Sequence, residues 1–171
     1  MYRILLFICF CIPSLLYAHQ PSYVNYTMAD GMPSNTVFCS MQDSKGYLWF
    51  GTDKGVARFD GIKFTVFTSS DGIADNIVYD IFEDSKKRIW FSCNNGNASY
   101  YYNNKFWNKN TDTALRSLTS NGLGLKVIED RAQNIYFLSQ FHLFKLSNEN
   151  KISTIDFEEN PMFSNLVLNE L

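Results

Sequence analysis

The sequence contains an internal repeat, and its period constrains the fold more than any other feature. Residues 43–46 have the composition of a tight turn, and the aromatic and β-branched stretch that follows is typical of a strand. The same block recurs 41 positions later, so that an alignment without gaps pairs Asp43 with Asp84, Trp49 with Trp90 and Gly55 with Gly96. A β-rich unit of about 40 to 45 residues has the length of one propeller blade.

Further markers extend this repeat along the chain. The segment 30–35 matches 71–76 at the same spacing, and a worn third copy places Asp130 and Tyr136 where the earlier copies have Asp and Trp. Gly46 ends the first turn, where we expect a positive φ. Lys87 stands in its place in the second copy and should adopt the same backbone at some cost in free energy.

These markers divide the chain into successive units. The divisions are a signal peptide (1–18), a lead-in (19–29), blade 1 (30–70), blade 2 (71–118), a degenerate blade 3 (119–160) and the start of a truncated blade 4 (161–171). Within the lead-in, Tyr23, Val24 and Tyr26 could pair as an edge strand or a closing strand. The polar segment 109–120 is interpreted as an exposed loop.

Turn residues between the apolar runs predict four strands in each blade. The expected strands are 37–42, 47–52, 56–60 and 63–68; then 77–83, 88–93, 98–102 and 106–108; then 125–129, 134–139, 143–146 and 151–156. Apolar residues fall on both faces of the first of these strands, which indicates a sheet placed between two neighbours.

The predicted fold class is therefore all-β, an incomplete propeller of four-stranded antiparallel blades. Propellers typically have about four to eight blades, so three blades and part of a fourth do not close a ring. An open stack leaves apolar faces bare at both ends. We therefore expect the chain to be part of something longer, and to self-associate when isolated.

Composition and charge exclude several classes of function. Hydrophobic residues make up 46% of the chain, which is incompatible with disorder, and the formal net charge of −2 predicts no nucleic-acid partner. Cys39 and Cys93 could pair in an oxidising compartment, although two small buried hydrophobic residues is the favoured interpretation. The two Cys and two His that follow the predicted signal peptide are not closely spaced, which excludes a zinc site, and no cofactor is expected.

The first 18 residues have the layout of a secretory signal. Arg3 precedes an apolar run over residues 4–17, and the small residue Ala18 follows it. An uncleaved membrane anchor is the alternative, but the run is shorter than the roughly 20 residues that span a bilayer. We expect an exported protein that is periplasmic or otherwise extracytoplasmic.

The repeat resembles the two-component regulator propeller repeat. The resemblance rests on residues 30–35, on 43–52 and on 55–61, and it fades over the second and third copies. It implies the N-terminal periplasmic sensor region of a Bacteroidetes-type sensor histidine kinase or hybrid two-component system. The partners implied are an external ligand, carbohydrate by this resemblance, the remaining blades, and a membrane-anchored kinase that is absent from this sequence.

Three functions remain open from the residues alone. A sensor that binds a ligand or relays its presence is favoured by the resemblance, a protein-protein interaction scaffold is the alternative, and a propeller lyase or hydrolase is third. No catalytic residue is identified, because most carboxylates lie at turns and His142 replaces a turn glycine. Asp80, an acid within an innermost strand, is the candidate ligand contact, with a hydrogen-bonded strand residue as the alternative.

Export predicts that the signal is removed from the mature protein. N-terminal sequencing of the exported chain should begin near His19, because the small residue before it matches the cleavage position of secretory signals. A mature protein that retains Met1 would contradict this prediction.

Overall fold

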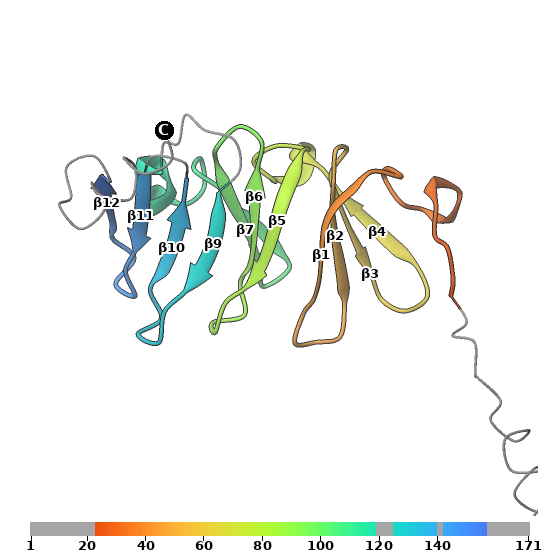
Figure 1. Cartoon of the computed structure of the whole chain (residues 1–171), viewed down its shortest axis with the longest axis horizontal. Coiled ribbons are helices and arrows are strands. Elements are labelled where there is room, and N and C mark those ends of the chain that lie inside the picture. Colours follow the sequence, from red (N-terminus) through yellow and green to blue (C-terminus); the bar gives the residue numbers. More distant parts are fainter. Residues whose placement is uncertain (1–22, 119–124, 140–141, 157–171) are drawn as a thin grey trace, which may run out of the picture.

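Three four-stranded antiparallel sheets follow one another along the chain and stand side by side (Figure 1). The computed structural model describes residues 23–118, 125–139 and 142–156. The predicted signal peptide and the start of a fourth blade lie outside these residues. Within them, the sheets confirm the all-β class and the repeated four-stranded unit that the 41-residue period predicts.

Each sheet is a meander in which consecutive strands pair. Blade 1 consists of β1 (Val37–Gln42), β2 (Leu48–Thr52), β3 (Val56–Phe59) and β4 (Phe64–Phe67); blade 2 of β5 (Val78–Glu83), β6 (Ile89–Cys93), β7 (Ala98–Tyr102) and β8 (Lys105–Trp107); blade 3 of β9 (Lys126–Glu129), β10 (Ile135–Leu138), β11 (His142–Leu146) and β12 (Ile152–Asp156). The first strands, β1, β5 and β9, lie next to each other and form the inner side of the stack.

Single residues that the turns require explain the hairpins. Gly46 has φ 91° and Lys87 has φ 67°, as their shared position predicts. Gly51 answers a different need, because a Cβ there would lie 2.6 Å from the Cys39 sulfur and 2.7 Å from the Val78 carbonyl oxygen. Only glycine therefore lets β2 approach the first strand of the next blade this closely.

The core lies between the blades and is centred on the two repeated tryptophans. Trp49 is fully buried and its ring centroid lies 5.6 Å from that of Phe91 in blade 2. Trp90 is equally buried and lies 5.2 Å from Phe137 in blade 3. Each Trp thus packs between its own blade and the next one, as the repeat predicts.

A buried aspartate fixes each tryptophan to the turn that precedes it. Asp43 accepts hydrogen bonds from the backbone N–H groups of Lys45 and Tyr47 at 2.9 Å and from Trp49 Nε1 at 2.8 Å. Asp84 accepts from Trp90 Nε1 at the same distance. In blade 3, the hydroxyl of Tyr136 donates to the corresponding oxygen of Asp130 at 3.1 Å, so that a phenol replaces the indole.

A second polar contact joins each blade to its neighbour. Ser44 donates from its backbone N–H at 2.8 Å and from its hydroxyl at 2.6 Å to the two carboxylate oxygens of Glu83. Ser85 and Glu129 repeat this pair of bonds at 2.8 and 2.6 Å between blades 2 and 3. We call each of these serine-glutamate pairs an inter-blade clasp.

Two expectations from the sequence are wrong in detail. The ungapped alignment matches Gly51 with Ser92 and Val56 with Asn97. In the structure, Gly51 pairs with Val56, but Ser92 pairs with Ala98 and not with Asn97. Gly96 is therefore not the structural counterpart of Gly55. The blade 2 turn is therefore one residue longer than the ungapped alignment assumes.

The segment after blade 2 is not simply an exposed loop. It contains a short 3-10 helix, η4 (Thr113–Ser117), in which the Asp112 side chain accepts a hydrogen bond from Ala114 N. Leu115 and Leu118 are each 1% exposed and belong to the core shared by blades 2 and 3. The polar composition of the segment predicted a loop, but Leu115 and Leu118, spaced by about one helical turn, are buried in the core.

Blade 2 is covered on both faces, whereas blades 1 and 3 are each covered on one. All five residues of β6 are buried. On the outer faces, by contrast, Leu48 and Val66 of blade 1 and Leu138 of blade 3 are 36 to 41% exposed. This agrees with the bare end faces expected for an open stack. Among the residues that the structure describes, blade 1 lacks the second neighbouring blade that its apolar pattern suggested.

Replacing either tryptophan by alanine should destabilise the protein strongly. For Trp49→Ala and Trp90→Ala we expect a loss of about 3–5 kcal/mol in the free energy of unfolding, because each substitution empties a large buried site. Urea denaturation followed by circular dichroism measures this loss. Trp107→Ala, which alters a partly exposed ring, is the matched control and should cost less, and losses below about 1 kcal/mol at both buried sites would contradict the packing described.

Breaking a clasp should cost less than emptying a core site. We expect Ser85→Ala to lower the free energy of unfolding by about 1 kcal/mol, because one hydrogen bond to a charged, partly exposed acceptor is lost while the backbone bond remains. Glu149→Gln is the control, since Glu149 is about 80% exposed and only faces Lys151 at 3.6 Å. Equal urea midpoints for the two variants would show that the clasp contributes nothing.

Candidate ligand-binding cleft

Arg58 lies at the boundary between blades 1 and 2 and is surrounded by aromatic rings. It is opposite Trp49 in the β2–β3 register, so both side chains are on the face toward blade 2. The guanidinium carbon lies 4.7 Å from the ring centroid of Tyr47, 5.6 Å from that of Trp49 and 5.9 Å from that of Tyr101. These distances place the cation within reach of favourable cation–π interaction with rings from both blades.

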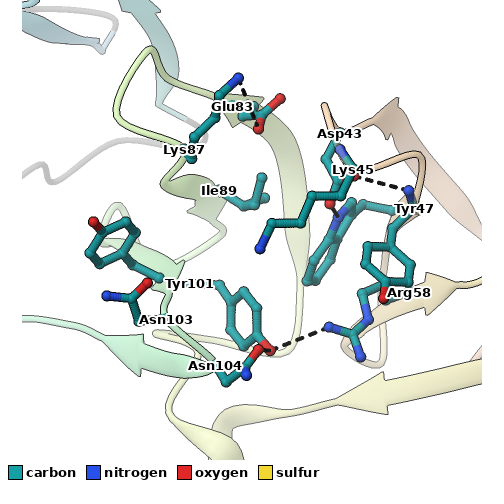
Figure 2. Close-up of a pocket in the computed structure, with 12 residues that line it drawn as sticks. Asp43, Lys45, Tyr47, Arg58, Glu83, Lys87, Ile89, Tyr101, Asn103 and Asn104 are labelled. Carbon is teal, nitrogen blue, oxygen red and sulfur yellow. Dashed lines mark hydrogen bonds and ion pairs between the residues drawn. The ribbon is translucent and has the colours of Figure 1, made fainter.

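A short hydrogen-bond chain runs from this arginine into blade 2. Arg58 Nη1 donates to the hydroxyl of Tyr101 at 3.3 Å, and that hydroxyl donates to Asn104 Oδ1 at 3.0 Å (Figure 2). Asn103 and Asn104 form the two-residue β7–β8 turn with φ 51° and 61°. Asparagine tolerates this left-handed region, and both side chains of the turn line the same cleft as the arginine.

The space in front of Arg58 is a cleft of about 310 Å³, at the low end of the range for small-molecule sites. Figure 2 shows Lys45 reaching into it from the β1–β2 turn. The cleft is lined from blade 1 by Asp43, Lys45, Tyr47, Trp49 and Arg58, and from blade 2 by Glu83, Lys87, Ile89, Tyr101, Tyr102, Asn103 and Asn104.

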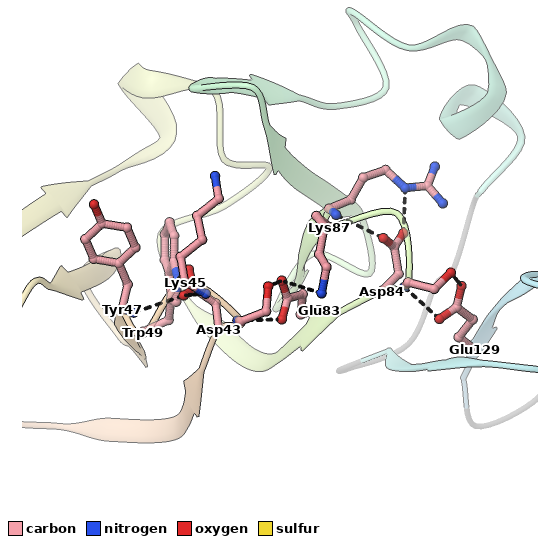
Figure 3. Close-up of polar contacts among 11 residues, drawn as sticks. Asp43, Lys45, Tyr47, Trp49, Glu83, Asp84, Lys87 and Glu129 are labelled. Carbon is pink, nitrogen blue, oxygen red and sulfur yellow. Dashed lines mark hydrogen bonds and ion pairs between the residues drawn. The ribbon is translucent and has the colours of Figure 1, made fainter.

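The charges in the cleft do not cancel locally. Both carboxylates are already engaged, Asp43 by its own turn and by Trp49, and Glu83 by Ser44 (Figure 3). Lys87 lies 3.8 Å from Glu83, but no carboxylate of the described residues lies within ion-pair distance of Lys45 or Arg58. The cleft therefore presents cations and aromatic rings, a combination suited to an anionic ligand with an apolar face.

At the equivalent position between blades 2 and 3, the polar side chains are paired within the protein. There the arginine and the tyrosine have changed places: Arg88 occupies the position of Tyr47, and Tyr100 that of Arg58. Arg88 Nε lies 2.5 Å from Asp84 Oδ2, so this cation is neutralised. Tyr100 donates its hydroxyl to Asp112 at 2.8 Å, and burial together with that bond raises the pKa of Tyr100 well above its ordinary value.

A larger hollow of about 460 Å³ lies at the outer edge of blades 1 and 2 but is a weaker candidate. Its one carboxylate, Asp71, accepts bonds from Thr68, and its lysine, Lys105, lies 4.7 Å above the ring of Trp107. Its charged groups are thus committed to the fold.

Asp80 is outside the cleft. It lies on β5, where its carboxylate faces Lys126 Nζ at 2.8 Å and Val127 N at 3.4 Å across the boundary between blades 2 and 3. These internal partners account for an acid on an innermost strand, and a role in ligand contact stays a prediction. His142 begins β11 and stacks on Phe144 at 5.9 Å.

Cys39 and Cys93 are free thiols, Cys93 buried and Cys39 half-buried. Burial raises the pKa of Cys93 to about 12 and that of Cys39 to about 11, so neither is a reactive thiolate near neutral pH. Within residues 23–118, 125–139 and 142–156, no three His, Cys, Asp or Glu side chains are grouped to hold a metal ion. Nor does that part of the chain contain a helix long and apolar enough to cross a membrane.

Sequence reasoning did not identify the residues of the cleft. Arg58 has a signal of its own, because it is a single charge between Ala57 and Phe59 in an otherwise apolar strand. The glutamates of the clasps also leave a trace, since Glu83 and Glu129 each stand directly before a signature aspartate. The other members come from separate strands and turns, and only the packing of two blades brings them together.

Comparison with known proteins supports the repeat assignment. The model of the two component regulator propeller family matches residues 31–54 and 72–95, which are equivalent segments of blades 1 and 2. No curated protein matches the chain.

Two solved structures have the same fold, and both are described as extracellular domains from B. thetaiotaomicron. That of the hybrid two component system BT3049 is 20% identical with a TM-score of 0.65, over 84% of this chain and 20% of its own length. That of the one component system BT4673 is 16% identical with a TM-score of 0.59, over 74% of this chain and 17% of its own length. The present chain therefore spans about a fifth of these domains.

Likeness at these identities establishes the fold, an incomplete propeller of four-stranded blades. The matched segments add the family to which the repeat belongs, and they confirm the resemblance seen in the sequence. The repeats of blades 1 and 2 are therefore similar to those of the two component regulator propeller family.

Proposed function

We propose that this chain is the N-terminal part of an extracytoplasmic sensor propeller of a two-component signalling protein, and that the cleft between blades 1 and 2 binds an external ligand. The observation that carries the proposal is Arg58, a cation held among aromatic rings of two blades without a carboxylate partner in the described residues. A fold that needed Arg58 only for stability would be expected to pair it, as Arg88 is paired.

The chemistry of the cleft favours a ligand with a negative group and a ring-shaped body. Guanidinium groups bind carboxylate and sulfate through paired N–H donors, and flat aromatic rings suit the apolar face of a sugar. An acidic carbohydrate meets both requirements and agrees with the ligand that the family resemblance implies. Asn103 and Asn104 would supply amide donors and acceptors for its hydroxyl groups.

The position of the cleft suggests how binding is relayed. Its walls belong to two sheets, which are joined there by the Ser44–Glu83 clasp and by the Arg58–Tyr101 hydrogen bond. A ligand that contacts both walls favours one relative placement of the blades over others. A membrane-anchored kinase in the complete protein would receive that change.

The alternative is a protein-protein interaction scaffold that uses the same surface, at the β1–β2 and β7–β8 turns. The exposed turn residues Lys45 and Asn103 favour neither a small ligand nor a protein partner by themselves. The two functions differ in what binds, and the experiment below separates them. A catalytic role has no support from the geometry, because both carboxylates in the cleft are already hydrogen-bonded within the protein.

We expect acidic oligosaccharides to bind in preference to neutral ones, and Arg58→Met to weaken that binding at least about tenfold, equivalent to about 1.4 kcal/mol. Methionine keeps much of the apolar bulk of arginine but removes the charge. Titration calorimetry with uronate-containing, sulfated and neutral oligosaccharides measures the effect. Tryptophan fluorescence, to which Trp49 in the cleft contributes together with Trp90 and Trp107, provides a second measurement.

Lys63→Met is the matched control, because it removes one positive charge from an exposed turn of blade 1 away from the cleft. It should leave affinity unchanged. Equal binding of neutral and acidic sugars, or an unchanged affinity in Arg58→Met, would contradict the proposed site. Absence of binding by every sugar would favour the scaffold.

A further inference from the structure

The outer face of blade 1 repeats an apolar pattern that is buried at both interfaces between blades. By strand register, Leu48, Phe50 and Phe59 of blade 1 correspond to Ile89, Phe91 and Tyr101 of blade 2 and to Ile135, Phe137 and Leu146 of blade 3. In blades 2 and 3 the first of these positions is 4% and 0% exposed, whereas Leu48 is 36% exposed. The face is therefore built like a blade interface, but no other blade covers it among the residues that the structure describes.

Residues 23–27 repeat the outermost strand of a blade. The sequence Tyr-Val-Asn-Tyr-Thr at 23–27 aligns with Phe-Thr-Val-Phe-Thr at 64–68, which contains β4. A matching capping box follows each: Asp30 accepts from Thr27 N at 2.7 Å, and Asp71 accepts from Thr68 N at 2.8 Å. Thr27 and Thr68 have nearly the same backbone, with φ of −130° and −131°.

The contacts of Tyr26 copy those that an outermost strand makes with the next blade. Phe67, at the end of β4, lies 5.8 Å from Tyr101 and 5.1 Å from Phe106 in blade 2. Tyr26 lies 5.1 Å from Phe59 and 5.3 Å from Phe64, which are the equivalent residues of blade 1. Tyr26 thus stands where the outermost strand of a preceding blade would end.

This strand has nothing to pair with in the part of the chain that the structure describes. Residues 23–27 belong to no sheet, and Tyr23 and Val24 are 90% and 72% exposed. Each of the three described blades already has its own outermost strand, β4, β8 or β12. A second copy of these blades would therefore contain no sheet that lacks its outermost strand, so this segment would complete none of them.

We propose that residues 23–26 are the outermost strand of a further blade, whose other three strands come from later repeats of the same polypeptide. That blade packs on the outer face of blade 1. Its second strand places an aromatic ring against Phe50. Trp49, on the second strand of blade 1, packs in the same way against Phe91, with ring centroids 5.6 Å apart. The propeller then closes by a blade with strands from both ends of the ring. This inference does not depend on the ligand cleft.

Two observations favour a blade of the same polypeptide as the occupant. The face continues the established interfaces residue by residue, and solved domains of this fold are about five times longer than the matched part of this chain. Gln42 stands where Glu83 and Glu129 accept the serine of a clasp. The turn of the further blade that corresponds to residues 43–46 should therefore contact a neutral amide in place of a carboxylate. This distinguishes the junction between that blade and blade 1 from the other two.

Hydrogen exchange on the protein encoded by the full reading frame tests the strand. The backbone amides of residues 24–26 should exchange at least about tenfold more slowly there than in the 171-residue chain, because they gain strand partners. The amides of β4 serve as an internal standard in both proteins. Exchange at the same rate in both, or a reading frame without further repeats, would overturn the proposal.

A variant of the outer face tests the docking. Phe50→Ser should lower the urea midpoint of the full-length protein much more than that of the 171-residue chain, where Phe50 has no blade against it. Ile62→Ser, at a turn residue that is 90% exposed, is the matched control and should affect neither protein. If Phe50→Ser instead converts a dimer of the full-length protein to a monomer in sedimentation, a second copy is the occupant of this face and the proposal is wrong.

Discussion

The turn aspartate of each repeat, which is buried in blades 1 and 2, is the group on which the rest of the blade depends. A carboxylate that is withdrawn from water is costly unless its oxygens are hydrogen-bonded, and Asp43 meets this demand with two turn amides and the indole of Trp49. One side chain therefore sets the β1–β2 turn and the orientation of the ring that packs between blades. Tyr136 shows that the bond matters more than the indole, because its hydroxyl reaches Asp130 although the ring is smaller.

Because the tryptophans pack forward onto the next blade, stability is shared between neighbours and not contained within a single sheet. Trp49 depends on Phe91, and Trp90 depends on Phe137. An end blade consequently has one covered face and one bare face, whatever its own sequence. The clasps follow the same direction, since the serine of one blade binds the glutamate of the next.

The sequence was sufficient to predict the three sheets and most strand ends to within one residue, because turn residues and the Asp–Trp spacing are local signals. It was not sufficient where the structure depends on depth or on a second blade. Leu115 and Leu118 lie in a polar segment, so their burial was not predicted, and one inserted residue before Ala98 was hidden by an alignment that still matched Gly55 with Gly96. Arg58 and Tyr101 are 43 positions apart and become a site only when two sheets pack.

The contrast between the two interfaces shows how a repeat can acquire a site without new elements. Both contain a Trp flanked by one arginine and one tyrosine, but in opposite order. In blade 2 the arginine is four residues after Asp84, so the turn itself brings Arg88 to the carboxylate. In blade 1 the arginine is on β3, opposite Trp49 in the strand register. Asp43 is hydrogen-bonded to the indole of Trp49 and forms no ion pair with this arginine. The two boundaries thus keep the same Trp packing, but the arginine is paired with a carboxylate at one boundary and, among the described residues, has no carboxylate partner at the other.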